Sequence, residues 1–472
     1  MNWRLGIVVG LLGAAGCATG PKYVRPEAPV PPSFKEAGDW KPAQPNDEAS
    51  RGAWWEIFDD AQLNGLEARL DVSSNTLRAA QAQFDQARAL VRSARAGEAP
   101  QVSGTATAIG NNQSENRPQR NPTSATHFTD YLLRLDASYE LDVWGRVRYS
   151  VAASRASAQA SAADLEVVRL SLHAELAANY FAVRALDTEQ EILQSSVASY
   201  QRALELTRNR LKGGVASAVD VAQAEAQLEG TRAQLVDVQA RRAQVEHAIA
   251  ALMGEPPSAV NVPVRPLAGE PPPIPAGLPA DLIERRPDIA AAERRVAAAN
   301  AQIGVAGAAF FPSLTLTGNA GFESAALVEL VRGVSGFWTA APAAAMVLFD
   351  GGRRRAVSDQ AKAGYERTVA LYRETALVAF REVEDQLATL RVLDEEAGVQ
   401  QAAVAASERS LALSTNRYKG GIATYLEVIS AQNTVLTNRR TAASILARRL
   451  TASVLLVKAL GGGWDTSKLP TR

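Results

Sequence analysis

The sequence predicts a mixed α and β fold in which short strands, suited to a membrane, precede very long helical hairpins. Three observations lead to this prediction: a long segment repeats at a fixed offset, each copy contains a proline-free stretch with helical periodicity, and residues of alternating polarity precede each stretch. The 472 residues are 47% hydrophobic, which is enough to bury a large core and excludes a mainly disordered chain.

The overall composition narrows the functional classes. Lys and Arg number 50 and Asp and Glu also number 50, so the chain lacks the positive field that recruits nucleic acid. Three His and one Cys cannot form a soft-metal cluster or an internal disulfide, and no Gly-rich phosphate loop, nucleophile elbow or pair of catalytic carboxylates is found. We therefore predict no nucleic-acid partner, no metal, no cofactor and no enzymatic activity, and we interpret His173 and His247 as ordinary helical residues.

The N-terminus has the features of a secretion signal. Residues 1–16 combine a short basic region with an apolar stretch that is too short for a stable membrane span. Cys17 follows small residues and resembles the acylated Cys of a bacterial lipobox, and the alternative is a plain signal peptide with an incidental Cys. Ala18 rather than Asp after that Cys favours the outer membrane. Residues 17–50 are rich in Pro, so we expect a lipidated, extended tether rather than a packed element.

An internal repeat divides the rest of the chain. The motif NRLKGG at 209–214 recurs as NRYKGG at 416–421, and the offset of 207 residues also relates Asp220 to Glu427. We predict a first repeat at 51–254, a Pro-rich linker at 255–280, a second repeat at 281–461 and a C-terminal tail at 462–472. Upstream the offset becomes 212, and the polar loop at 111–122 is the expected place for the additional residues.

Each repeat contains a long helix. The proline-free stretches 123–255 and 343–469 carry apolar residues at steps of three and four. We predict helices over 146–211 and 353–418, each roughly 100 Å long at 1.5 Å per residue. The Lys-Gly-Gly turns stop these helices and send the chain back in a second helix, so each repeat should form a long antiparallel hairpin.

A pattern with a period of two precedes each long helix. Between 130 and 143, apolar and mainly charged residues alternate, and 101–109, 313–319 and 338–348 supply further candidate strands. One apolar and one polar face suit a sheet between lipid and water, and the alternative is a half-buried sheet of a soluble domain. After the signal, no stretch of about eighteen residues is apolar without a charge, so a membrane crossing would use strands. Four strands cannot close a barrel, and open edges are not tolerated in lipid, so several chains must share one barrel.

Several stretches carry a family resemblance: CATGPKYVRP (17–26), WWEIF (54–58), LPADLIERRPDIAAAERRVAAANAQIGVAGAAFFPSLTLTG (278–318), LFDGGRRR (348–355) and both Gly-Gly turns. On these stretches the chain resembles an outer-membrane efflux lipoprotein of the TolC/OprM type, particularly the NodT-like subgroup. The resemblance implies a homotrimer with a shared twelve-stranded outer-membrane β-barrel, four strands per protomer, continuous with a long periplasmic α-helical barrel of coiled-coil hairpins. It also implies a passive exit duct for small molecules, with a periplasmic adaptor, an inner-membrane pump and outer-membrane lipid as partners and most of the chain in the periplasm.

The same resemblance places the functional residues at the periplasmic end, where the hairpins turn. After the second turn, Leu426 matches an apolar constriction, Glu427 an acidic ring position, and Ser430 a position where a second acid is common. Tyr418 and Asp220 match a pair that ties neighbouring coiled coils shut. The alternative for Asp220 and Glu427 is a solvated charge at a helix start, where the helix dipole favours acids.

The turns themselves are the expected docking surface for the adaptor, because Gly permits a tight reversal and a close approach of the backbone. The residues predicted to dock are Gly213, Gly214, Val215, Ala216 and Ser217 in the first turn and Gly420, Gly421, Ile422, Ala423 and Thr424 in the second. Two other functions remain open, an adaptor-type lipoprotein and a structural coiled-coil lipoprotein. An adaptor would carry a single hairpin between β segments, and a structural coiled coil would not need amphipathic strands, so both fit the two-copy pattern less well.

Overall fold

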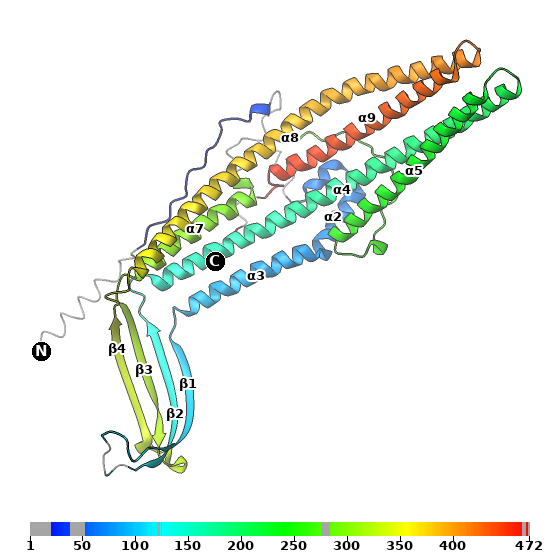
Figure 1. The fold of residues 1–472 in the computed structure, drawn as a ribbon. Coiled ribbons are helices and arrows are strands. Elements are labelled where there is room, and N and C mark those ends of the chain that lie inside the picture. Colours follow the sequence, from blue (N-terminus) through cyan, green and yellow to red (C-terminus); the bar gives the residue numbers. More distant parts are fainter. Residues whose placement is uncertain are drawn as a thin grey trace.

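The computed structural model describes residues 20–37, 52–119, 123, 125–274, 284–464 and 469–470. The chain is elongated, with a β-sheet at one end and long helices that extend away from it to two helical turns at the other end (Figure 1). The predicted mixed α and β fold is therefore confirmed. The expected signal peptide and Cys17 lie outside the described residues.

A four-stranded antiparallel sheet forms one end of the molecule. Its strands are β1 (Gln101–Asn112), β2 (His127–Glu140), β3 (Ser313–Ser324) and β4 (Gly336–Ala345), and they lie in the order β1-β2-β3-β4. All four predicted strand segments are found, and each differs from its predicted bounds by a few residues. β1 and β4 each have one neighbour in the sheet, so both outer edges lack a partner strand among the described residues.

The pairing register separates the sheet into one apolar and one polar face. Leu135 of β2 lies opposite Gly104 of β1 and Ala320 of β3, and Ala320 in turn lies opposite Trp338 of β4. Residues that lie opposite one another share a face, and every second residue along a strand returns to it. The side chains of the apolar face include Val102, Ala106, Ala108, Tyr131, Leu133, Leu135, Ala137, Tyr139, Leu314, Leu316, Ala320, Phe322, Trp338, Ala340, Pro342 and Ala344. Leu135 is 60% exposed and Trp338 is 78% exposed, so the described part of the chain leaves this face of the sheet largely uncovered at these positions.

Two helices of equal length form the spine of the molecule. α4 (Arg146–Lys212) and α8 (Arg353–Lys419) have 67 residues each and agree with the predicted helices to within one residue at either end. An aspartate starts each helix: the Asp142 carboxylate accepts the amides of residues 147 and 148 at 2.9 and 2.8 Å, and the Asp350 carboxylate accepts the amide of residue 354 at 3.1 Å. Such a carboxylate satisfies amides that have no partner in the first helical turn.

The returning helices are shorter than a symmetric hairpin requires. α5 (Ala218–Leu252) and α9 (Tyr425–Ala459) have 35 residues each, so they accompany only about half of their 67-residue partners. The prediction of antiparallel hairpins holds for the half that ends in the turns. Nearer the sheet, α3 (Asn75–Ala96) packs on α4, and α7 (Pro287–Ala308) packs between α4 and α8. Sequence reasoning did not anticipate α3 or α7.

Accessory segments cover one side of the helical layer. They comprise α2 (Ala61–Ser73), the segment that follows α5, and short 3-10 helices at Lys35–Ala37, Trp54–Phe58 and Pro257–Ala259; two more 3-10 turns, Leu327–Glu329 and Gly333–Ser335, lie between β3 and β4. The N-terminal segment 20–37 is largely extended, as its Pro content predicts, yet it is packed along the helices. The amides of Lys35 and Glu36 donate to the Glu384 carboxylate of α8 at 2.6 and 2.9 Å, and Asn300 of α7 donates to the Pro21 carbonyl at 3.1 Å. The expectation of an unpacked tether is therefore wrong for this part.

The largest hydrophobic core lies where α2 and the Trp54–Phe58 turn meet α4 and the ends of α5 and α9. His173 of α4 is buried there and stacks on Trp55 with ring centroids 4.3 Å apart. Its Nδ1 lies 2.6 Å from Glu67 Oε2 and its Nε2 lies 3.3 Å from Asp71 Oδ1. Burial raises the pKa of the Glu67 carboxyl to about 7. His173 is therefore a packed helical residue, and its two acidic neighbours come from α2, which its local sequence does not reveal.

Candidate functional site

The predicted aperture residues and docking turns all lie at the end of the molecule farthest from the sheet. The turns α4–α5 and α8–α9 form the two tips in Figure 1. Their backbones are near copies: Gly214 has φ +75° and Gly421 has φ +76°. The amide of Val215 donates to the Arg210 carbonyl at 2.9 Å, and the amide of Ile422 donates to the Arg417 carbonyl at 3.0 Å. A left-handed residue after a helix end favours Gly, which explains why both copies keep this residue.

The outermost side chains of the two turns are apolar. Val215 is 65% exposed and Ile422 is 74% exposed, and the repeat offset relates these two residues. Ala216 and Ala423 follow them, so each tip presents a small apolar surface beside a glycine backbone. Exposed apolar side chains at a helical tip are suited to contact another protein.

The helix starts after the two turns differ in their side-chain chemistry. In the first, the Asp220 amide donates to Ser217 Oγ at 3.2 Å and the Ser217 amide donates to Asp220 Oδ2 at 2.9 Å, which is a reciprocal capping box. In the second, Thr424 makes no capping bond with its side chain. Glu427 instead lies 3.8 Å from Arg417 in a half-exposed ion pair.

Tyr418 and Arg210 join the two hairpins. Tyr418 is 4% exposed, and the Arg210 guanidinium lies 4.7 Å from the centre of its ring. Arg210 also donates to the Lys419 carbonyl at 3.0 Å, and the Tyr418 hydroxyl lies 3.4 Å from Thr207 Oγ1 on α4. Within the chain, Tyr418 therefore contacts α4 residues, while the carboxylate of Asp220 is engaged by Ser217.

Below Tyr418, a small core continues the contact between the hairpins. The Tyr425 ring lies 5.3 Å from the Tyr418 ring, and the Tyr200 hydroxyl donates to the Gln432 carbonyl at 3.3 Å. Gln227 Nε2 donates to Asn433 Oδ1 at 2.7 Å at the surface. Burial raises the pKa of the Tyr425 hydroxyl to about 12, so this side chain is neutral at physiological pH.

A shallow hollow of about 510 Å³ runs along one face of α9 just beyond the second turn. Its lining comprises Leu426, Ile429, Ser430, Asn433, Thr434, Thr437 and Asn438. The steps of three and four place these residues on one helix face, and none of them carries a charge. Leu426 and Ser430, two predicted aperture residues, thus share this neutral face, and the Glu427 carboxylate lies beside it rather than in its lining.

Sequence reasoning missed three contributors to this site: Arg210, Tyr425 and Tyr200. Arg210 belongs to the repeated motif NRLKGG, which served to identify the repeat, and only its Lys-Gly-Gly part was interpreted further, as a helix stop. Tyr425 stands seven residues after Tyr418. In a continuous helix this spacing would predict that the two rings share a face, but a turn separates them, so the sequence did not predict their contact. Among the described residues, no group of three His, Cys, Asp or Glu side chains could hold a metal ion.

Comparisons with known proteins agree over nearly the whole length. The family model "Outer membrane efflux protein" matches residues 68–255 and 278–462. A "Probable efflux pump outer membrane protein TtgC" of Pseudomonas putida is 33% identical over 462 residues, which cover 98% of this chain and 95% of that protein. "Outer membrane protein OprJ" of Pseudomonas aeruginosa is 33% identical and covers 97% of this chain and 95% of that protein. The crystal structure of the CmeC outer membrane channel of Campylobacter jejuni superimposes with a TM-score of 0.90 at 25% identity, over 96% of both chains.

Proposed function

Because the chain belongs to the outer membrane efflux protein family, we infer that it forms the outer-membrane exit duct of a tripartite efflux system. One observation of the structure carries this function: a four-stranded sheet with an apolar face and two open edges continues into helices of 67 residues. The apolar face suits lipid, and the open edges require strands from other copies. No described helix has both the length and the apolar composition that a membrane span requires.

We propose a homotrimer in which β4 of one copy pairs with β1 of the next. The test is the mobility of the outer-membrane fraction in detergent gels. A trimer of this kind should migrate as one species without heating and as single chains after boiling, and it should conduct ions in planar bilayers. A protein that stays monomeric without heating, or that gives no conductance, would contradict the duct.

The internal repeat also indicates how the helices of neighbouring copies meet. Within one copy, α7 packs on α8 of its own repeat and on α4 of the other repeat. α3, its counterpart in the first repeat, packs mainly on α4, and of its 22 residues, all of them described, Leu77 alone is buried. We propose that α3 completes its packing on α8 of the next copy. Leu90→Asp, at an exposed position of α3, should then lower the trimer yield, whereas Leu90→Met should not.

The tip that lies opposite the sheet is the proposed aperture. Three copies of Leu426 and Ser430 around a common axis would narrow the duct with neutral side chains, while Glu427 adds an acidic group beside them and Asp220 and Tyr418 support the closed arrangement. The neutral lining of the hollow on α9 supports this assignment, because a constriction of this kind restricts flow mainly by size and apolarity. We expect a small conductance with a modest preference for cations.

The two turns are the proposed docking surface for a periplasmic adaptor, which in turn contacts an inner-membrane pump. The exposed Val215 and Ile422 support this role, together with the glycine backbones of Gly213, Gly214, Gly420 and Gly421. Ala216, Ser217, Ala423 and Thr424 complete the surface. We propose that the duct is passive and that no catalytic step occurs in this chain, so energy and selection come from the pump.

We propose a lipid anchor at Cys17, and the position of Gly20, the first described residue, supports it. The Gly20 amide donates at 2.8 Å to the hydroxyl of Tyr149, which lies at the start of α4 next to the sheet. Three residues span roughly 10 Å when extended, so an acyl chain on Cys17 would reach the membrane surface at this junction. Cys17→Ser should abolish labelling by a radioactive fatty acid while heat-sensitive trimers persist. Labelling that survives the substitution would remove the anchor.

A further inference from the structure

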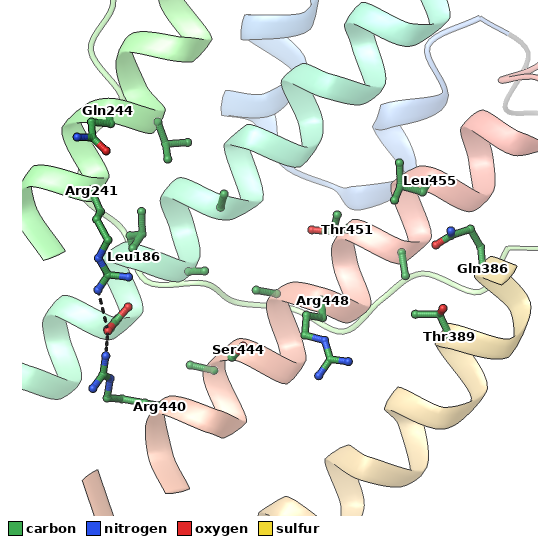
Figure 2. A pocket seen from close by; sticks show the side chains of 17 residues that line it. Leu186, Arg241, Gln244, Gln386, Thr389, Arg440, Ser444, Arg448, Thr451 and Leu455 are labelled. Carbon is green, nitrogen blue, oxygen red and sulfur yellow. Dashed lines mark hydrogen bonds and ion pairs between the residues drawn. The ribbon is translucent and has the colours of Figure 1, made fainter. Parts of the chain in front are cut away.

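A second hollow, of about 680 Å³, lies halfway along the helical layer and is lined by all four long helices. Figure 2 shows it from close by, with Arg241 and Gln244 on α5, Leu186 on α4, Arg440 to Leu455 on α9, and Gln386 and Thr389 on α8. Its size falls within the range of about 300–1,000 Å³ that small-molecule sites occupy. The proposed aperture and docking turns do not include any of these residues.

The hollow opens on the side of the helical layer that is opposite the accessory segments. On α8, the N-terminal segment contacts Glu384, and the lining residues Gln386 and Thr389 are two and five positions further along. At 100° per residue these positions lie about 140–200° around the helix from Glu384.

The same relation holds on α4. Arg184 donates to the Pro263 carbonyl at 2.6 Å in the segment after α5, and the lining residues Ala182 and Leu186 flank it by two positions. If three copies close into a tube, the bulky accessory segments lie on its outside, because they would fill the lumen otherwise. The hollow, on the opposite side of the helical layer, then faces the lumen.

The lining of the hollow combines apolar and basic side chains. Small side chains such as Ala182, Ala185, Ala443 and Ala447 supply much of the apolar lining, which we call the alanine floor, and Leu186 adds a larger apolar surface. Three guanidinium groups, Arg241, Arg440 and Arg448, reach the lining, against a single carboxylate, Glu189. The lining therefore carries an excess of positive charge beside an apolar surface.

Carboxylates hold the three arginines to different degrees. Arg241 and Arg440 both donate to the carboxylate of Glu189, Arg241 at 3.1 Å. Dashed lines from these two labelled arginines in Figure 2 mark the contacts. Arg241 also pairs with Asp237 outside the lining at 3.0 Å. Arg448 makes one long contact, 3.5 Å to Glu396, and both side chains are about half exposed. Arg448 is thus the guanidinium that a ligand can engage with the least competition.

We propose that this hollow is a binding site for amphiphilic anions, with the apolar part on the alanine floor and the anionic group on Arg448. An aromatic or alkyl carboxylate or sulfonate of modest size has the required chemistry, because a charge-assisted bond to the guanidinium adds to the burial of apolar surface. The placement of the site inside the duct rests on the proposed function. The binding itself does not.

The test compares three ligands that share one ring system: 2-naphthalenesulfonate, the neutral 2-naphthalenesulfonamide and the cationic 2-naphthylmethylammonium. Each is titrated by calorimetry into the purified full-length trimer in detergent, with empty micelles as the blank. The sulfonate should bind saturably, the sulfonamide about tenfold more weakly, and the ammonium not measurably, since a hydrogen bond to a charged group contributes about this factor. Equal binding of sulfonate and ammonium, or no saturable binding of the sulfonate, would overturn the proposal.

Substitutions that should weaken and substitutions that should strengthen sulfonate binding test whether Arg448 is the residue that binds the anion. Arg448→Gln should weaken sulfonate binding about tenfold, while Glu396→Gln, which releases Arg448, should strengthen it by a factor of about two. Ala447→Phe should block the floor and remove binding, and Arg409→Gln, an exposed arginine of α8 that does not line the hollow, is the charge-matched control. Binding that is unchanged in Arg448→Gln would refute the assignment.

Failure of this proposal can be distinguished from failure of the duct. Each variant is also examined for heat-sensitive trimers and for conductance in planar bilayers without ligand, which report on the duct and not on the hollow. If wild-type trimers form and conduct but do not bind the sulfonate, the binding site is refuted and the duct stands. If the sulfonate binds a protein that forms no channel, the hollow stands and its position inside a duct is refuted.

Discussion

The α4–α5 and α8–α9 turns contain the same repeated motif. Their backbone conformations are nearly equal, but their side chains make different contacts. Gly214 and Gly421 have the same left-handed conformation, and the same pair of helix-end hydrogen bonds surrounds each. The first turn closes on itself through the Ser217–Asp220 capping box. The second turn instead supplies Tyr418, which packs against Arg210 of the other hairpin. Both copies therefore share the backbone geometry of the turn, while the contact between the hairpins uses different residues from each copy, Arg210 and Thr207 from the first and Tyr418 from the second.

This difference matters because a tube of six nearly equivalent hairpins would have nearly sixfold symmetry. Contacts that only the second turn makes reduce the symmetry of the tip to threefold. A threefold closure can be released at three identical places without loosening the other turns. The following substitutions test whether the two turns differ in function as they differ in contacts, and they are arranged from the largest expected effect to the smallest.

The largest effect should come from removing the ring that only the second turn possesses. Tyr418→Ala deletes a buried aromatic side chain, so the tip should lose about 3 kcal/mol of local stability and the conductance in planar bilayers should rise. Leu211→Ala is the matched control, because Leu211 occupies the same position in the first repeat and is 38% exposed, whereas Tyr418 is buried. Equal increases in conductance for the two variants would show that the two hairpins close the aperture alike.

The docking surface should respond nearly as strongly, and here the turns should behave alike. Val215→Asp and Ile422→Asp each place a charge on an exposed apolar position, which costs about 1.5–3 kcal/mol if that side chain is buried against an adaptor. Site-specific crosslinking to the adaptor in whole cells measures the loss, and heat-sensitive trimers serve as the folding control. A loss in one variant alone would mean that the adaptor distinguishes the two turns.

A smaller effect should separate the two helix starts. Ser217→Ala removes a capping bond and should cost about 1 kcal/mol of local stability, whereas Thr424→Ala removes no such bond and should cost very little. Amide hydrogen exchange in the first turns of α5 and α9 reports both values in the intact trimer. Faster exchange in Thr424→Ala than in Ser217→Ala would contradict the capping asymmetry.

The smallest effect should concern ion selectivity. Glu427 lies beside the neutral hollow and pairs with Arg417 at 3.8 Å, so Glu427→Gln should reduce the preference for cations by a factor of only about two. Reversal potentials in a salt gradient across a planar bilayer give this ratio. Complete loss of selectivity would instead place the Glu427 carboxylate in the narrowest part of the duct.

The sequence predicted the parts of the fold that depend on local periodicity. α4 and α8 were placed to within one residue because unbroken apolar steps begin after a Gly and end at a Lys-Gly-Gly turn. β2 was clear because charged and apolar residues alternate along it. β4 was weaker, since its many Ala residues give little contrast between its faces.

What the sequence could not predict depends on contacts between segments far apart in the chain. α7 is deeply buried and α3 is largely exposed although they are counterparts in the repeat, and this difference arises from which long helices each one contacts. The ring of Tyr418 meets Arg210 across more than two hundred residues, and no periodicity encodes that pairing. The tie between neighbouring coiled coils that the resemblance implied for Tyr418 and Asp220 stays a prediction, and within the chain the Asp220 carboxylate caps its own helix.

The stability of the folded chain depends on the concentration of other copies. The reason is that β1 and β4 have unpaired edges and that the sheet exposes an apolar face, which includes Leu135 and Trp338. A single copy has no way to satisfy these strand edges, so a free energy of unfolding per chain has no meaning apart from the concentration of the other copies. Because three chains must meet, the balance between separate chains and a closed barrel depends on the third power of chain concentration. When synthesis becomes slower than degradation, the amount of assembled duct should therefore fall much more steeply than the total amount of the chain.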